Sequence, residues 1–166
     1  MASQTAHAST QGTLGATSTG SVTINASIAS RVQISGLSDV TFNAVDPMIA
    51  ASSAQNVCVW SNTNNRGYRI TASGNGSGSA FTLASGVLPV VPYSVEWAGS
   101  SGQASGTALS SGTALTGLTS TATNPTCSTG ATSSASLIVK MASADLQAMQ
   151  AGPTYTGTLT LLVAPE

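Results

Sequence analysis

The stretch TYTGTLTLLVAPE (residues 154–166) alternates apolar and polar side chains, the pattern of a half-buried β-strand. We expect one face of this strand to carry Tyr155, Leu159, Leu161 and Val163, and the other to carry Thr156, Thr158 and Thr160. The backbone edge of such a strand must find a partner, because an open apolar edge is a template for association. The fold therefore depends on which segment pairs with residues 154–166, and whether that segment belongs to the same molecule.

The composition favours one extracellular, β-rich domain over a cytosolic enzyme. Only 5% of the 166 residues are charged, against about 25% in an average soluble domain. With a net charge of -1, the chain has no basic patch for nucleic acid or for an anionic membrane. It also has no apolar run long enough for a membrane helix and no basic, apolar signal peptide at its start. We therefore expect neither a nucleic-acid partner nor stable membrane insertion.

Short apolar or alternating runs, separated by Gly-, Ser- and Asn-rich segments, predict an all-β sandwich or barrel. They cover residues 21–28, 31–34, 39–43, 56–60, 68–73, 80–83, 92–97, 136–141 and the last strand. One short helix is expected in SADLQAMQAG (143–152), with Ser143 as its N-cap. The sequence Ser-Gly-Thr-Ala-Leu occurs twice in residues 105–115, and we interpret it as a short local repeat, too short for a solenoid.

The two cysteines, Cys58 and Cys127, can form a disulfide or remain as two buried thiols. The composition suits an oxidising compartment, which favours the disulfide. The bridge would close a long loop and stabilise the fold by about 4 kcal/mol in the chain-entropy model.

The chain offers no set of residues for catalysis or metal binding, so we expect no catalytic residue, metal site or cofactor. The single histidine, His7, lies in the polar leader (residues 1–19), no Cys/His spacing suits a metal site, and the sequence has no Gly-x-Ser-x-Gly motif. Glu96 and Asp145 could be imagined as paired carboxylates, but we interpret them as solvated surface residues. Trp60 and Trp97 are read as core or rim residues in preference to a carbohydrate-stacking platform.

A second strand of the same quality lies near the start of the chain. In STGSVTINASIAS (18–30) the apolar face consists of Val22, Ile24, Ala26 and Ile28, and a charge-free leader precedes it. This strand can fold back and cap its own sheet, or insert into a neighbouring copy. Composition and period do not choose between the two arrangements.

Three segments together resemble subunits of the chaperone-usher pathway of Gram-negative bacteria, in particular the archaic (spore coat protein U-like) and CFA/I-like pilins. These segments are SVTINASIASRVQISGLSD (21–39), LPVVPYSVEW (88–97) and AGPTYTGTLTLLVAP (151–165). The likeness covers most of residues 20–166 in pattern. Two features depart from it: the region after the first strand lacks the cysteine that many archaic pilins have, and the leader before Gly20 is longer than a donor strand requires.

The resemblance implies an incomplete immunoglobulin-like β-sandwich that is completed by a donor strand from a neighbouring subunit. Residues 1–30 would be leader and donor strand, with Val22, Ile24, Ala26 and Ile28 as the inserted side chains. Residues 31–166 would be the pilin domain. One side of its acceptor groove would carry Tyr155, Leu159, Leu161 and Val163.

The resemblance also implies a function without catalysis. The chain would be exported through the periplasm and polymerise with copies of itself into an extracellular pilus that supports adhesion or biofilm formation. A periplasmic chaperone and an outer-membrane usher would be its partners during assembly. The alternative is a self-contained carbohydrate- or surface-binding β-sandwich whose first strand lies in its own sheet.

Overall fold

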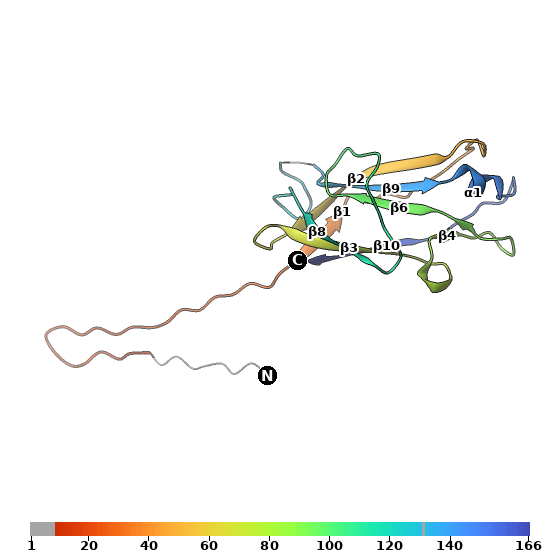
Figure 1. Cartoon of the computed structure of the whole chain (residues 1–166). Helices are drawn as coiled ribbons and strands as arrows, with labels where there is room; N and C mark the ends of the chain where they lie inside the picture. Colours follow the sequence, from red (N-terminus) through yellow and green to blue (C-terminus); the bar gives the residue numbers. More distant parts are fainter. Residues whose placement is uncertain (1–8, 131) are drawn as a thin grey trace.

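A computed structural model describes residues 9–130 and 132–166. The fold is nearly all β, as the sequence predicts, and its strands form antiparallel sheets (Figure 1). The largest sheet has five strands in the order β1-β2-β9-β6-β7. Their bounds are Val32–Ser35 (β1), Ala51–Ser61 (β2), Ala135–Met141 (β9), Ser94–Ala98 (β6) and Thr107–Ala108 (β7).

A second sheet of three strands packs against the first and has the order β10-β3-β8. Its strands are Leu159–Pro165 (β10), Gly67–Gly74 (β3) and Ala114–Thr119 (β8). The pair β4 (Thr82–Leu83) and β5 (Val91–Pro92) forms a small third sheet, and the two short helical turns are η1 (Ser77–Ser79) and α1 (Ser143–Gln147). No helix in the described part of the chain is both long and apolar enough to span a membrane.

Alternating residues of both sheets form the main core. On β3 the buried side chains are Tyr68, Ile70 and Ala72, while Arg69 between them is exposed. Trp97 of β6 is 1% exposed, and its indole N–H donates to the Tyr68 hydroxyl at 3.1 Å. This hydrogen bond joins the two sheets and satisfies both polar groups, which would be costly to bury unpaired.

The predicted disulfide is confirmed and joins β2 to the loop between β8 and β9. Cys58 and Cys127 are 69 positions apart, and their Cα atoms lie 5.9 Å from each other. Both cysteines are buried with Ala122, and the half-buried Trp60 packs against them. Trp60 is thus a rim residue of this small cluster, whereas Trp97 belongs to the main core.

Several predicted elements differ from the observed ones in their bounds. Residues 39–43 were expected to form a strand, but they are extended without a strand partner. The expected helix is present as α1, although its N-cap is Ala142 and not Ser143. The short local repeat of residues 105–115 contains β7 and leads into β8. The register of β8 against β3 shifts at a bulge, where Gly117 has a φ of 72°.

Residues 9–30 lie outside the two packed sheets as an arm that projects from one end of the molecule (Figure 1). The arm folds back on itself, and one reciprocal backbone pair between Thr10 and Ser21 holds the hairpin. The segment 21–28, predicted as a strand, has no other strand partner within the described chain. His7 and the first part of the leader lie outside the described residues.

Candidate functional site

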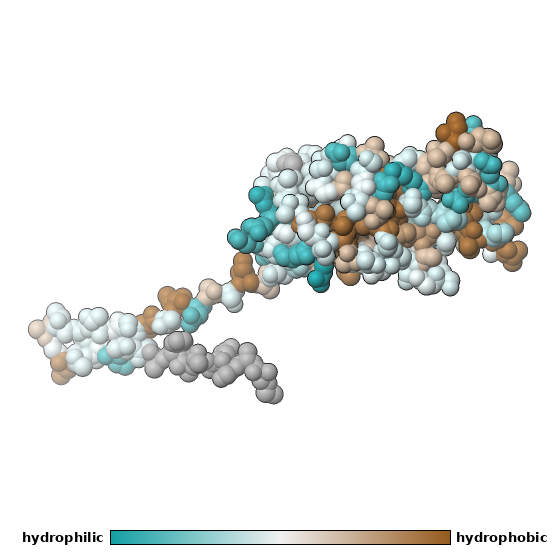
Figure 2. Space-filling view, in the orientation of Figure 1, coloured by the Kyte–Doolittle hydropathy of each residue, from teal (hydrophilic) through white to brown (hydrophobic). Residues whose placement is uncertain are grey.

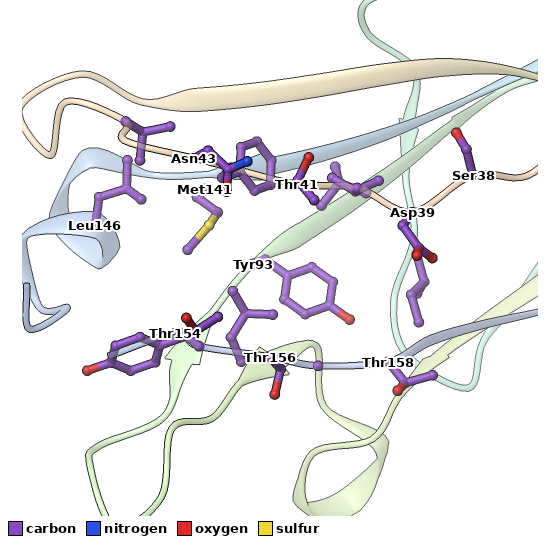
Figure 3. Close-up of a pocket in the computed structure, with 18 of the residues that line it drawn as sticks. Ser38, Asp39, Thr41, Asn43, Tyr93, Met141, Leu146, Thr154, Thr156 and Thr158 are labelled. Carbon is purple, nitrogen blue, oxygen red and sulfur yellow. The ribbon is translucent and has the colours of Figure 1, made fainter. Parts of the chain in front are cut away.

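A long groove with a volume of about 750 Å³, lined by apolar and polar side chains including Asp39, lies between the edges of the two packed sheets (Figure 3). One wall is the segment 37–45, which continues β1 at the edge of the five-stranded sheet. The other wall is formed by residues 153–161, which lead into β10 at the edge of the three-stranded sheet. The groove therefore separates two extended edges, and one inserted strand would lie next to both of them.

The first wall has a free backbone. Among the described residues, no backbone hydrogen bond joins residues 39–45 to a second strand. At the near end of the wall, the Gln55 side chain takes the place of a strand partner: its Oε1 accepts from Ser38 N at 2.8 Å and its Nε2 donates to Ser38 O at 2.9 Å. From residue 39 to residue 45, the backbone N–H and C=O groups have no hydrogen-bond partner in the part of the chain that the structure describes.

The second wall also has a free edge, because β3 is the one strand that pairs with β10 among the described residues. Thr156 bonds with Ala84, Thr158 O accepts from Asn75 N, and Glu166 N donates to Gly67 O. These even-numbered residues bond on the side of β3 and β4, so the intervening odd-numbered backbone groups point toward the groove. Each wall thus offers a row of donors and acceptors to an inserted strand.

The floor of the groove is apolar and comes from the centre of the fold. It includes Leu137, Val139 and Met141 of β9, together with Tyr93 and Leu146. Tyr93 projects between the two walls (Figure 3), and burial raises the pKa of its hydroxyl. Phe81 supports this ring, with the two ring centroids 5.7 Å apart.

Three of the four side chains predicted for the acceptor groove line it. Tyr155, Leu159 and Leu161 contribute to the second wall. Val163 lies one step further along β10, outside the groove lining, and packs against the main core. The predicted residues thus form a continuous row of which the last member lies beyond the end of the groove.

The predicted donor side chains are brought neither into this groove nor against the core. Val22, Ile24 and Ile28 lie on the arm with 74%, 87% and 88% of their surfaces exposed, and Ala26 is exposed as well. Large apolar side chains in a row at this exposure indicate a surface that is covered by something else. The same chain therefore carries an open apolar groove and an apolar strand that does not fill it.

Asn62 fixes the direction in which the arm leaves the body. Its Oδ1 accepts from Arg31 N at 2.6 Å, its Nδ2 donates to Ala29 O at 2.9 Å, and its backbone N donates to Arg31 O at 3.1 Å. These bonds prolong the β1–β2 pairing onto residues 29–31. The arm therefore continues β1 outward, away from the groove.

Charged groups play no part in the groove floor. Glu96, considered above as half of a carboxylate pair, bonds with Lys140 through Oε1 at 2.6 Å and accepts from Gly106 N through Oε2 at 2.9 Å. The hydrogen bond from Lys140, followed by that from Gly106, lowers the pKa of Glu96. No group of three or more His, Cys, Asp or Glu side chains that could hold a metal ion occurs in residues 9–130 and 132–166.

The sequence analysis missed three contributors to the site. The alternation of Val40 and Phe42 in residues 39–43 was the available signal for the first wall, but it was read only as another strand. Tyr93 and Asn62 carry no recognisable sequence signal, since their roles depend on the way distant segments meet.

No protein-family model and no curated protein matches the chain. The function therefore has to be argued from the groove, the arm and the residues that form them.

Proposed function

We propose that this protein is a structural pilus subunit that polymerises by donor-strand exchange, with the groove as acceptor and residues 20–30 as donor. The observation that carries the proposal is the pairing of two unsatisfied features in one chain. A groove with a free backbone edge on each side occurs together with an exposed apolar strand that points away from it. The groove would bury the apolar side chains of the arm, and the arm would bond to the free backbone edges of the groove. A polymer of copies satisfies both.

The donor is short enough to fit along the acceptor wall. Residues 22–28 would extend over about 20 Å and residues 37–45 over about 27 Å at the usual rise of a strand. Alternate donor side chains, at Val22, Ile24, Ala26 and Ile28, would then enter the groove between Phe42 and Leu161. The donor backbone would add hydrogen bonds on both sides, which is the general mode of strand addition to a sheet edge.

On this proposal the fold is an incomplete immunoglobulin-like sandwich whose missing strand comes from the next copy. The resemblance in the sequence supplies the rest: a periplasmic chaperone that protects the groove before assembly, an outer-membrane usher, and a cell-surface filament that supports adhesion or biofilm formation. The activity is an exchange of strands and needs no cofactor.

The arm's direction favours a partner in another molecule. Insertion into the groove of the same chain would require a reversal at residues 29–31, where Asn62 bonds to the backbone on both sides of Ser30. Loss of these bonds would oppose the self-contained alternative, in which the first strand caps its own sheet.

The experiment is a denaturing gel of the purified protein, with and without boiling, beside a variant that lacks residues 1–30. Strand-exchanged polymers should resist denaturant without heat, because the inserted strand leaves only through a high unfolding barrier. We expect a ladder of multimers that collapses on boiling and is missing from the truncated variant.

A single monomer band in every lane, from protein that is still folded, would refute donor-strand exchange. The self-contained carbohydrate- or surface-binding module would then become the leading function. A ladder that persists in the truncated variant would show that the polymer is joined through another part of the chain.

A further inference from the structure

Exposed apolar side chains occur at the mouth end of the body, which we define as the end formed by loops 46–50 and 84–90 and by α1. Met48, Ile49, Val87 and Val90 are between 59% and 102% exposed. Figure 1 shows these loops together at the end opposite the arm, and Figure 2 shows brown apolar surface at the same end.

A satellite cluster brings the two loops together. Its buried members are Val91, Met141, Leu146 and Tyr155, and the residues packed against it include Ala51 and Leu88. Ile49 precedes Ala51 by two positions, and Val87 and Val90 flank Leu88. Most members of this cluster also line the groove, so the exposed side chains surround the place where the groove opens.

The opposite end, called here the arm end, offers a complementary hollow. The hollow has a volume of about 450 Å³ and is lined by Ser27, Ile28, Ala29, Arg31, Trp60 and Asn62. Trp60 is half-buried and Ile28 almost fully exposed. Both are large apolar side chains in reach of a partner that approaches the base of the arm.

The charges of the two ends are also complementary. Asp46 and Asp145 lie at the mouth end, whereas Arg31 and Arg66 lie at the arm end with Glu166, whose Oε2 accepts from Gly117 N. The only ion pair within residues 9–130 and 132–166 joins Lys140 to Glu96. Asp46, Arg31 and Arg66 are thus left without a charged partner in the described part of the chain.

The direction of the inserted strand decides which ends meet. The segment 37–45 runs toward the mouth end and β10 runs back (Figure 1), so a donor is antiparallel to one wall and parallel to the other. A donor parallel to β10 would bring its own body to the acceptor's arm end, where β1, the end of β10 and the acceptor's arm already crowd together. A donor antiparallel to β10, the commoner pairing, places its body at the open mouth end.

We propose that the mouth end is an interface for a second copy of this chain, whose arm end packs against it when the donor strand is inserted. This inference rests on the proposed function. Met48, Ile49, Val87 and Val90 contact the surface around Trp60 at the base of the donor copy's arm, and Asp46 lies toward Arg31. Such a head-to-tail contact extends into a filament when the rotation between copies does not close a ring.

The experiment places a photo-crosslinking amino acid at Ile49 in the full chain, with Thr116 on the exposed face of β8 as the control position. Filaments are irradiated, boiled to release strand-exchanged copies, and run on a denaturing gel. We expect dimers that survive boiling only for the Ile49 site, with the adduct mapped to residues 27–31 or 60–62 of the other copy.

Suppose that the multimer ladder forms without irradiation, but that irradiated filaments with the crosslinker at Ile49 show no dimer after boiling. That result would refute the interface and leave donor-strand exchange intact. An adduct elsewhere on the neighbouring copy would likewise overturn it. The absence of any ladder in the unirradiated wild-type protein would instead refute the proposed function, and the interface with it.

Discussion

Ile24 and Ile28 are the side chains on which the proposed assembly depends most. Both are nearly fully exposed on the arm, and burial of one isoleucine side chain is worth about 1.5 to 3 kcal/mol. No other part of the described chain provides that burial for them. Their contribution to stability would appear only when copies join.

Ile24→Asp should abolish the ladder of multimers on the unboiled gel, because the substitution would place an unpaired carboxylate in an apolar groove. The matched control is Asn25→Asp, which adds the same charge at the neighbouring position, on the other face of the donor strand. We expect the control to polymerise normally. Equal polymer yields from both variants would contradict the proposed register of the donor.

Glu96 and Lys140 make the stability of the folded protein depend slightly on pH. The pKa of Glu96 is lowered from 4.5 by its hydrogen bonds with Lys140 and Gly106, so the ionised form is favoured by folding. Its contribution is complete above the unfolded pKa and is lost as the pH falls through the lower folded value. Because the pair is partly exposed, the contribution should be under about 1 kcal/mol.

Glu96→Gln should therefore lower the free energy of unfolding slightly at neutral pH and leave it unchanged at a pH well below the folded pKa of Glu96. Urea unfolding of both proteins at the two pH values measures the difference. A gap of the same size at both values would assign the effect to packing and not to ionisation.

At the scale of elements, the Cys58–Cys127 bridge connects β2 to the long loop between β8 and β9. Replacing both cysteines by alanine should lower the free energy of unfolding by about 4 kcal/mol, because the unfolded chain regains the entropy of a long loop. Chemical unfolding of the variant measures the loss. Reduction of the wild-type protein is the control and should produce a loss of similar size; an unchanged transition would mean that the bridge contributes nothing.

Alternation in the sequence was sufficient to predict β3, β6 and β10, whose apolar residues recur at every second position. A compact apolar run predicted β9, which is buried on both faces, and the second half of β2. Alternation failed for β8, where the bulge at Gly117 interrupts the period, and for β7, whose two residues are too few to show one. It overpredicted residues 21–28, since a strand pattern does not say whether a partner is within the same chain. Local signals therefore predict strands better than they predict their pairing.

The site was predictable only in part for the same reason. The row from Tyr155 to Leu161 could be named from the last strand together with the family resemblance. Residues 37–45 face this row across the groove because of the way the chain crosses from one sheet to the other. A local sequence pattern does not show that crossing. Tyr93 and Asn62 acquire their roles only through contacts between segments that are far apart in sequence.

At the scale of the whole molecule, the open groove should make the body of the protein a receptor for its own arm sequence. A peptide of residues 20–30 added to the variant that lacks residues 1–30 should raise its unfolding temperature in a concentration-dependent way, because a ligand of the native state stabilises it by mass action. The control peptide carries Ile24→Ser and Ile28→Ser, which keep the length and remove the two largest side chains. Equal shifts from the two peptides would argue against insertion of the apolar face.

The arm base and the mouth of the groove lie at opposite ends of the body, and this placement has a mechanical consequence. A pull along a filament of such subunits would enter each body through residues 29–31 and leave through the donor strand in its groove, nearly parallel to the strand axes. Force in that direction loads the hydrogen bonds on both sides of the donor in shear, so that they must break together and not one after another. The same geometry that joins the copies would thus make the joint resistant to tension, and the rate of forced unfolding, not the equilibrium stability, would set the strength of the fibre.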